Sequence, residues 1–358
     1  MSFTRLYKEV SRHATTLLFI GGFIFDLIIL PEAGHFATIW IGLLYLSIVA
    51  LSIAAREWVI SRNTASTGEQ KMFSLLTFAI AYFSGSALSF VCVYTIRSAI
   101  FSVSWPLLLI LLVCVLANEF ISSHHFRFTL DIGVFLIALF FYIVFNVPLF
   151  LKIQNDTTFL MSTVIAVGLS LLFVYCLSFT SDSAKEEASK SYALAIGIPM
   201  FISMLYFLNV IPAVPLSLTN AGIYHKVTRN ESGAFNGIEE KDTRLFSALR
   251  TPVYHRSSLD NSVYFFSAVG APALLTAPIS HVWEYYDAVP KMWVEKFSIA
   301  FTLAGGREDG YRAFSQKENI ESGLWRVTVK VDDKRIVGRV KFYVTDSDAP
   351  VSLEATSL

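Results

Sequence analysis

The sequence is poor in charged residues. Lys, Arg, Asp and Glu make up 16% of its 358 residues, whereas a soluble domain carries about 25%. Hydrophobic residues make up 54%, with 31 Phe and 15 Tyr, and the mean hydropathy is +0.56. So much apolar surface excludes intrinsic disorder. The composition predicts a membrane protein with several spanning helices and a soluble part.

An excess of positive charge is also lacking. The 28 Lys and Arg residues balance the 28 Asp and Glu residues, so the formal net charge at pH 7 is +0. Proteins that bind nucleic acid need a concentrated basic surface to neutralise phosphates. We therefore expect the lipid bilayer as a partner and no nucleic acid.

Cysteine is scarce, and the common catalytic motifs are missing. Cys92, Cys114 and Cys176 lie in apolar runs and have no metal-ligand spacing, which favours buried thiols over a redox centre. No HExxH, GxSxG or P-loop motif occurs. We therefore expect no metal site and no cofactor. No catalytic residue can be assigned, and a binding function is favoured over a catalytic one.

Seven apolar runs dominate the first 214 residues. Crossing a bilayer takes about 20 mostly apolar residues, and short polar breaks separate the runs. They lie near 14–30, 36–55, 72–94, 101–117, 128–145, 159–179 and 192–214. Residues 1–214 are thus predicted to form a multi-pass α-helical membrane domain with about seven transmembrane helices.

The cations between these runs indicate an orientation. Cytoplasmic loops carry the excess of Lys and Arg. With a cytoplasmic N-terminus, the inner segments hold nine cations, namely Arg5, Lys8, Arg12, Arg56, Arg62, Lys71, Arg127, Lys185 and Lys190, and the outer loops hold Arg97 and Lys152. Seven spans would then place residues 215–358 outside the cytoplasm, in a protein of the plasma (inner) membrane. This placement requires the first run to span the membrane.

Three acidic residues lie in or beside the apolar runs: Asp26, Glu119 and Asp131. Ionisable groups at membrane depth are costly, and each is a functional hypothesis by default. Glu119 and Asp131 suggest a proton relay or a metal-assisted site, or else an interfacial loop over 118–131. For Asp26 the alternative is a structural role, with Arg97 or a buried Ser or Asn as its partner.

From residue 215 the pattern changes to short alternating strands. Apolar and polar residues alternate over 324–331 and 336–344, around a turn at 332–334, which predicts a hairpin. Further strands are expected near 223–228, 246–254, 263–269, 281–286, 293–303 and 311–315. Such a series predicts an all-β sandwich. We assign it to residues 215–350, followed by a C-terminal tail at 351–358.

Four motifs of this region carry a family resemblance: Val263–Ser267, His281–Tyr286, Tyr311–Ser315 and Gly323–Val327. They resemble the bacterial family of domains of unknown function numbered 2914. The upstream segments 22–26, 104–106, 118–120 and 215–218 resemble the membrane region that precedes this domain in some members. The resemblance implies a bacterial cell-envelope protein with an Ig-like extracytoplasmic domain, and it implies no activity.

The family motifs supply four candidate ligand-binding residues: His281, Trp283, Arg312 and Trp325. Together they suggest an aromatic shelf for a sugar or a lipid head group, with Arg312 binding an anionic substituent. In the alternative interpretation, alternation turns both Trp rings into the core. His281 would then be a hydrogen-bonded interior residue, and Arg312 would anchor a loop.

Two functions follow from these observations. The first is a non-enzymatic membrane protein of the bacterial cell envelope, whose β-sandwich binds an envelope protein, glycan or lipid. The alternative is a membrane enzyme or transporter that uses the intramembrane acidic residues. A purely structural assembly factor is a third possibility.

Overall fold

The computed structural model describes most of the chain as two compact units. The helical unit ends at Pro215, and the β unit begins at Leu216. The described residues are 12–29, 36–62, 66–96, 124–153, 155–211, 216–231, 234–241, 251–256, 262–270, 276–304, 311–347 and 351–358, with Leu109 and Val113 as isolated additions.

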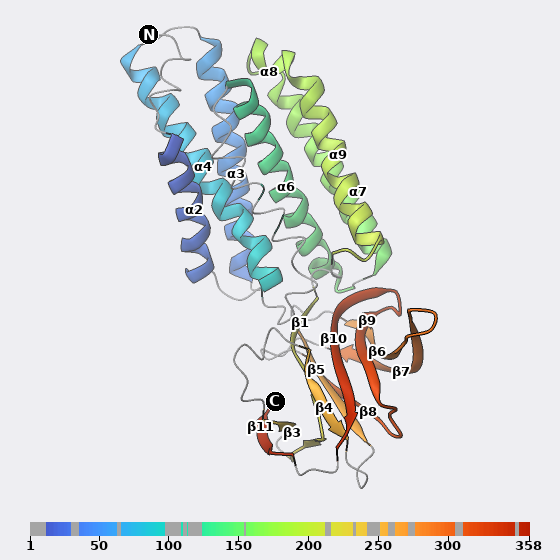
Figure 1. Cartoon of the computed structure of the whole chain (residues 1–358). Coiled ribbons are helices and arrows are strands. Elements are labelled where there is room, and N and C mark those ends of the chain that lie inside the picture. The colour runs from blue at the N-terminus through green and yellow to red at the C-terminus, as the bar shows by residue number, and fades with distance from the viewer. Residues whose placement is uncertain are drawn as a thin grey trace. The chain divides into compact units, whose positions relative to one another are not determined.

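The helical unit contains seven described helices (Figure 1). They are α2 (Arg12–Ile29), α3 (Phe36–Ser61), α4 (Thr67–Ile96), α6 (His124–Leu151), α7 (Asp156–Leu177), α8 (Asp182–Glu186) and α9 (Ala188–Phe207). Five of them, α3, α4, α6, α7 and α9, are long and apolar enough to cross a membrane. The predicted multi-pass helical domain is therefore confirmed. Helix α2 contributes a shorter apolar stretch, Ala14–Asp26, and the predicted run 101–117 lies outside the described segments.

Helix α6 forms the centre of the bundle (Figure 1). It contacts α3 and α4 on one side and α7 and α9 on the other. Its buried aromatic side chains include Phe135, Phe140, Phe141 and Phe145.

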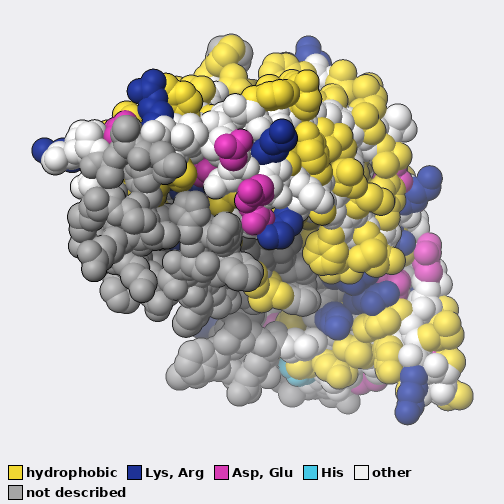
Figure 2. Space-filling model, turned by 90° about the horizontal axis from the view of Figure 1, so that it is seen from above, with side chains coloured by type: hydrophobic (Ala, Val, Ile, Leu, Met, Phe, Trp, Pro, Cys, Tyr) yellow, Lys and Arg dark blue, Asp and Glu magenta, His cyan; other side chains and the backbone are white. Residues whose placement is uncertain are grey.

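The outside of the helices is apolar as well. Six aliphatic or aromatic side chains within the described helices are at least 68% exposed, namely Leu17, Ile28, Leu51, Leu75, Phe150 and Val164. Figure 2 shows a broad apolar area beside the charged side chains at the end of the bundle. An exposed apolar surface of this extent suits contact with lipid rather than water.

Helices α2 and α4 touch at two glycines. A Cβ atom on Gly85 would overlap the backbone carbonyl of Phe19, and one on Gly22 would overlap the carbonyl of Tyr82. Small residues let helix backbones approach closely in membrane proteins. Gly22 and Gly85 therefore fix the packing of α2 against α4.

We expect Gly85→Ala to destabilise the bundle, because the new methyl group must push α2 away from α4. Overpacking of this kind costs about 1–3 kcal/mol. The matched control is Gly168→Ala in α7, where a Cβ meets no atom within 4 Å. Thermal unfolding of both full-length variants in mild detergent checks this, and equal midpoints would contradict the close contact.

The β unit contains eleven described strands. They are β1 (Ser217–Tyr224), β2 (Lys226–Arg229), β3 (Phe235–Glu240), β4 (Val253–Arg256), β5 (Val263–Gly270), β6 (Thr276–Asp287), β7 (Met292–Ala304), β8 (Tyr311–Lys317), β9 (Gly323–Val331), β10 (Arg335–Asp346) and β11 (Leu353–Ser357). They form a five-stranded sheet β4-β10-β9-β6-β7 and two three-stranded sheets, β1-β5-β8 and β11-β3-β2.

The five-stranded sheet packs on β1-β5-β8 and so makes the predicted sandwich. Trp283 of β6 lies against Phe265 of β5, with ring centroids 6.2 Å apart. The predicted hairpin joins β9 to β10, and Asp332 and Asp333 in its turn have φ near +50° (51° and 53°). An all-β sandwich is therefore confirmed for the C-terminal part.

The C-terminal residues are a strand rather than a tail. Leu353–Ser357 forms β11, which pairs antiparallel with β3. The last residue, Leu358, packs with Tyr224 and Phe235 in a small apolar cluster. The expected tail at 351–358 is thus corrected, because backbone pairing and this cluster hold the segment against the domain.

Candidate functional site

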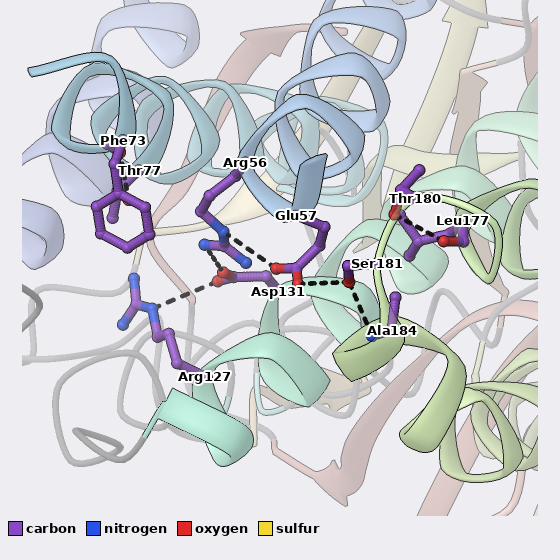
Figure 3. A network of polar contacts seen from close by, with 10 residues as sticks. All are labelled: Arg56, Glu57, Phe73, Thr77, Arg127, Asp131, Leu177, Thr180, Ser181 and Ala184. Carbon is purple, nitrogen blue, oxygen red and sulfur yellow. Dashed lines mark hydrogen bonds and ion pairs between the residues drawn. The ribbon is translucent and has the colours of Figure 1, made fainter. Parts of the chain in front are cut away.

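Four ionisable side chains form a buried network near the ends of α3 and α6 (Figure 3). Arg56 Nη1 lies 2.6 Å from Asp131 Oδ2, and Arg127 Nε lies 3.4 Å from Asp131 Oδ1. Glu57 Oε1 is 3.6 Å from Arg56 Nε. All four side chains are at most 6% exposed. Two cations and two carboxylates therefore balance one another inside the bundle.

The turn between α7 and α8 also joins this network. Ser181 caps α8, because its hydroxyl accepts a hydrogen bond from the backbone N–H of Ala184 at 2.9 Å. The same hydroxyl donates to Glu57 Oε2 at 3.5 Å. Figure 3 shows Ser181 between Glu57 and Ala184. The charge network thus connects α3 and α6 with the start of α8.

The sequence identified only part of this network. Asp131 was a candidate, but Arg56 and Arg127 were expected as loop cations, and Glu57 was missed. Burial of both arginines corrects that assignment. The signal in the sequence was the Arg56-Glu57 pair next to an apolar run, since two opposite charges can be buried together inside a helix bundle.

Asp26 of α2 lies in a separate polar cluster. It is 1% exposed, and Tyr45 of α3 donates a hydrogen bond to its Oδ1 at 3.0 Å. Ser86 of α4 lies beside the same carboxylate. Of the partners expected for Asp26, the described residues thus provide the buried serine and add a tyrosine. Arg97 and Glu119 lie outside the described residues.

The aromatic shelf suggested by the family motifs is an interior feature. His281, Trp283 and Trp325 are at most 1% exposed. His281 Nε2 lies 2.7 Å from Ser267 Oγ, and His281 Nδ1 lies 3.0 Å from Ser315 Oγ. A sugar or lipid cannot reach these rings in the folded domain, because the facing sheet covers them. The interior alternative is the one that the structure favours.

Both tryptophans satisfy their N–H groups inside the core. Trp283 Nε1 donates to Ser315 Oγ at 3.0 Å, and Trp325 Nε1 donates to the carbonyl of Glu321 at 2.8 Å. Arg312, the fourth candidate, is half-buried on β8 opposite Ala268 of β5. Arg312 is therefore not part of the buried interior that holds the other three candidates. A binding role for Arg312 stays a prediction.

Burial lowers the pKa of His281 to about 3 from its ordinary value of 6.5. Because the unfolded chain then binds the proton more readily, stability should fall as the pH drops below 6.5, by about 1.4 kcal/mol per pH unit. His281→Gln should remove this slope. Hydrogen exchange of β6 measured between pH 6.5 and the ordinary Glu pKa of 4.5 checks it, and an unchanged slope in the variant would contradict the neutral interior histidine.

A second polar cluster of the β unit was not predicted. Glu240 of β3 accepts hydrogen bonds from His225 Nε2 at 3.0 Å and from His255 Nδ1 at 2.7 Å. Burial raises the pKa of Glu240, but these hydrogen bonds outweigh burial, and the pKa lies below its ordinary value. The ring nitrogens are directed at the carboxylate, and no group of three or more His, Cys, Asp or Glu among the described residues could hold a metal ion. The cluster ties β3 to β4.

The segment from β6 to β10 also matches a known family. Residues 276–344 match the family described as "Protein of unknown function (DUF2914)". This confirms the predicted C-terminal DUF2914 domain. The DUF2914 segment runs from β6 into β10 and so contains all four candidate residues of the family motifs.

Other comparisons add little. No curated protein matches the chain. Among solved structures, the chain is similar to the Pseudomonas fluorescens alkylpurine DNA glycosylase AlkC bound to DNA containing an abasic site analog, with 11% identity and a TM-score of 0.20, over 88% of this chain and 99% of that chain. A TM-score this low carries no argument about fold or function.

Proposed function

We propose that the protein is an integral protein of the bacterial plasma membrane whose DUF2914-containing β unit binds a partner protein outside the cytoplasm. The helices hold the protein in the bilayer, and the edge strand β7 is the docking element. The observation that carries this proposal is an apolar strip on β7 that the second sheet of the sandwich leaves half-uncovered.

The strip consists of Phe297, Ile299 and Phe301. In register, Ile299 lies beside His281 of β6, so the strip points to the same side of the sheet as the buried core. His281 is fully buried, whereas the three strip residues are only half-buried. The five-stranded sheet is wider than the three-stranded sheet that faces it. Burial therefore falls from β6 to β7, and apolar surface is left for a partner.

The backbone of β7 offers a second means of contact. Strand β7 ends the order β4-β10-β9-β6-β7, so one of its edges has no strand partner among the described strands. It is 13 residues long, and an open edge of this length is a template for strand addition. A protein segment can pair with this edge and cover the strip, which favours a protein partner over a glycan or a lipid.

Photo-crosslinking in cells tests the docking strand. A benzophenone amino acid at position 299 should give a defined adduct with a partner protein, and one at the exposed Lys334 in the β9–β10 turn should not. Ile299→Lys should then abolish binding of the identified partner. Ser298→Lys is the matched control, because Ser298 is the exposed neighbour on the opposite side of the same strand. Equal binding by both variants would sink the proposal.

The proposed orientation has its own test. A single cysteine at position 334, in a chain whose native cysteines are replaced by serine, should react with a membrane-impermeant maleimide in intact spheroplasts. A cysteine at the exposed Arg62, after α3, should react only after the membrane is opened. The reverse pattern would place the β unit in the cytoplasm and overturn the envelope assignment.

A further inference from the structure

We propose that Asp26 is an exchangeable proton-binding site inside the helical bundle, and that its protonation stabilises the packing of α2 against α4. This inference is independent of the docking role of β7. It rests on one buried carboxylate that the described residues leave incompletely satisfied.

Among the described residues, the carboxylate has Tyr45 as a hydrogen-bond donor and no cation beside it. Tyr45 donates to Oδ1, whereas Oδ2 is buried and accepts no hydrogen bond from the described part of the chain. No described Lys, Arg or His forms an ion pair with Asp26, and the titratable groups beside it are Tyr45 and Tyr82. A bare carboxylate in such surroundings is costly. Since no described side chain neutralises it, we infer that a proton from solvent does.

Asp131 shows the contrast within the same bundle. Its two carboxylate oxygens each lie beside an arginine, Oδ2 beside Arg56 and Oδ1 beside Arg127. Its charge is thus neutralised by the protein itself. Asp26 has no such neighbour among the described residues, and this difference assigns proton binding to Asp26 and not to Asp131.

The groups around Asp26 fit a proton better than a metal ion. Ser86 of α4 is fully buried beside the carboxylate. Its hydroxyl has no hydrogen-bond partner within 3.5 Å among the described residues. A proton on Oδ2 can be donated to Ser86 Oγ and satisfies both atoms at once. Divalent cations take six or more oxygen ligands. Two hydroxyls flank this carboxylate, and that of Tyr45 already donates a hydrogen bond to it.

Protonation then connects to helix packing. Ser86 follows directly after Gly85, whose missing side chain allows α4 to touch α2 at Phe19. Asp26 lies one helical turn after Gly22, the other glycine of this contact. The proton is taken from water and returned to water. When it leaves, the carboxylate needs hydration, and the close contact of α2 with α4 has to open.

Labelling with dicyclohexylcarbodiimide tests the proposal, because this reagent modifies protonated carboxylic acids in apolar surroundings. In the full-length protein in mild detergent, peptide mass spectrometry should find the label on Asp26 and not on Asp131. The labelled fraction should rise as the pH is lowered within the range in which the protein stays folded.

Tyr45→Phe supplies the decisive variant. It removes the hydrogen bond to the ionised form, so the pH of half-labelling should rise by about one unit or more. Asp26→Asn should abolish the label, and the wild-type profile remains informative if that variant does not fold. No label at any pH, or labelling that does not change with pH, would overturn the proposal. Protection of Asp26 from the label by sodium ions would also overturn it, because the site would then bind sodium instead of a proton.

Discussion

Asp131→Asn is expected to destabilise the helical unit by about 3–5 kcal/mol, because it leaves two buried arginines without their shared carboxylate. Arg56 and Arg127 contact Asp131 from opposite oxygens. Among the described carboxylates, Glu57 then remains beside Arg56. Chemical unfolding of the full-length variant in mild detergent, followed by tryptophan fluorescence, measures the loss.

The matched control is an ion pair at the surface. Lys190 Nζ lies 2.8 Å from a Glu187 oxygen, and the Lys190 side chain is 66% exposed. Lys190→Gln should therefore cost at most about 1 kcal/mol. If both variants lose the same amount of stability, the network contributes no more than a surface pair.

A double variant tests whether Arg56 and Asp131 act as a pair. Arg56→Gln with Asp131→Asn removes a cation and an anion together, so the remaining buried groups carry no net charge, whereas each single variant leaves a net charge of one. The double variant should thus lose less than the sum of the two single losses. Additive losses would mean that Arg56 and Asp131 do not act as a pair.

The network also shows why the sequence predicted α3 too short. The apolar run was expected to end at residue 55, where the charges of Arg56 and Glu57 begin. The helix continues to Ser61, because Asp131 and Ser181 accommodate those charges. These partners come from distant parts of the chain. Which helices become neighbours depends on packing, which a linear hydropathy pattern does not contain.

The β unit was predictable to a different extent. Period-two alternation placed Trp283 and Trp325 on the inward face, and the hairpin of β9 and β10 followed from its turn. Strands β3 and β11 were missed, because FNGIEE and LEATS lack a regular apolar alternation. They pair with each other through backbone hydrogen bonds, and such pairing leaves little trace in side-chain polarity.

The position of Asp26 in an apolar run made it a candidate, but the sequence did not predict which residues surround it. Tyr45 lies 19 residues further along the chain and Ser86 another 41. Ser86 reaches Asp26 because α4 packs closely on α2, with Gly22 and Gly85 at the contact. Both glycines are visible in the sequence, but their role in packing could be assigned only once it was known that α2 contacts α4.

The second large effect is expected in the sandwich core, where Trp283→Ala should cost about 3–5 kcal/mol. The indole is fully buried between the two sheets, against Phe265 and Phe342. Its removal leaves a cavity and takes one hydrogen-bond donor from Ser315. Hydrogen exchange of β6 and β9 in the full-length protein should accelerate by about two to four orders of magnitude.

Trp293→Ala on β7 is the control for this experiment. Trp293 is half-buried at the sheet edge, where the Arg326 guanidinium lies 4.3 Å from its ring centroid. Its loss should cost less than about 2 kcal/mol, since less apolar surface and one cation–π contact are lost. A Trp283→Ala variant that kept wild-type exchange but lost its partner would make Trp283 a binding residue after all. Trp283→Phe then distinguishes ring volume from the hydrogen bond, because phenylalanine fills most of the site and leaves Ser315 with His281 alone.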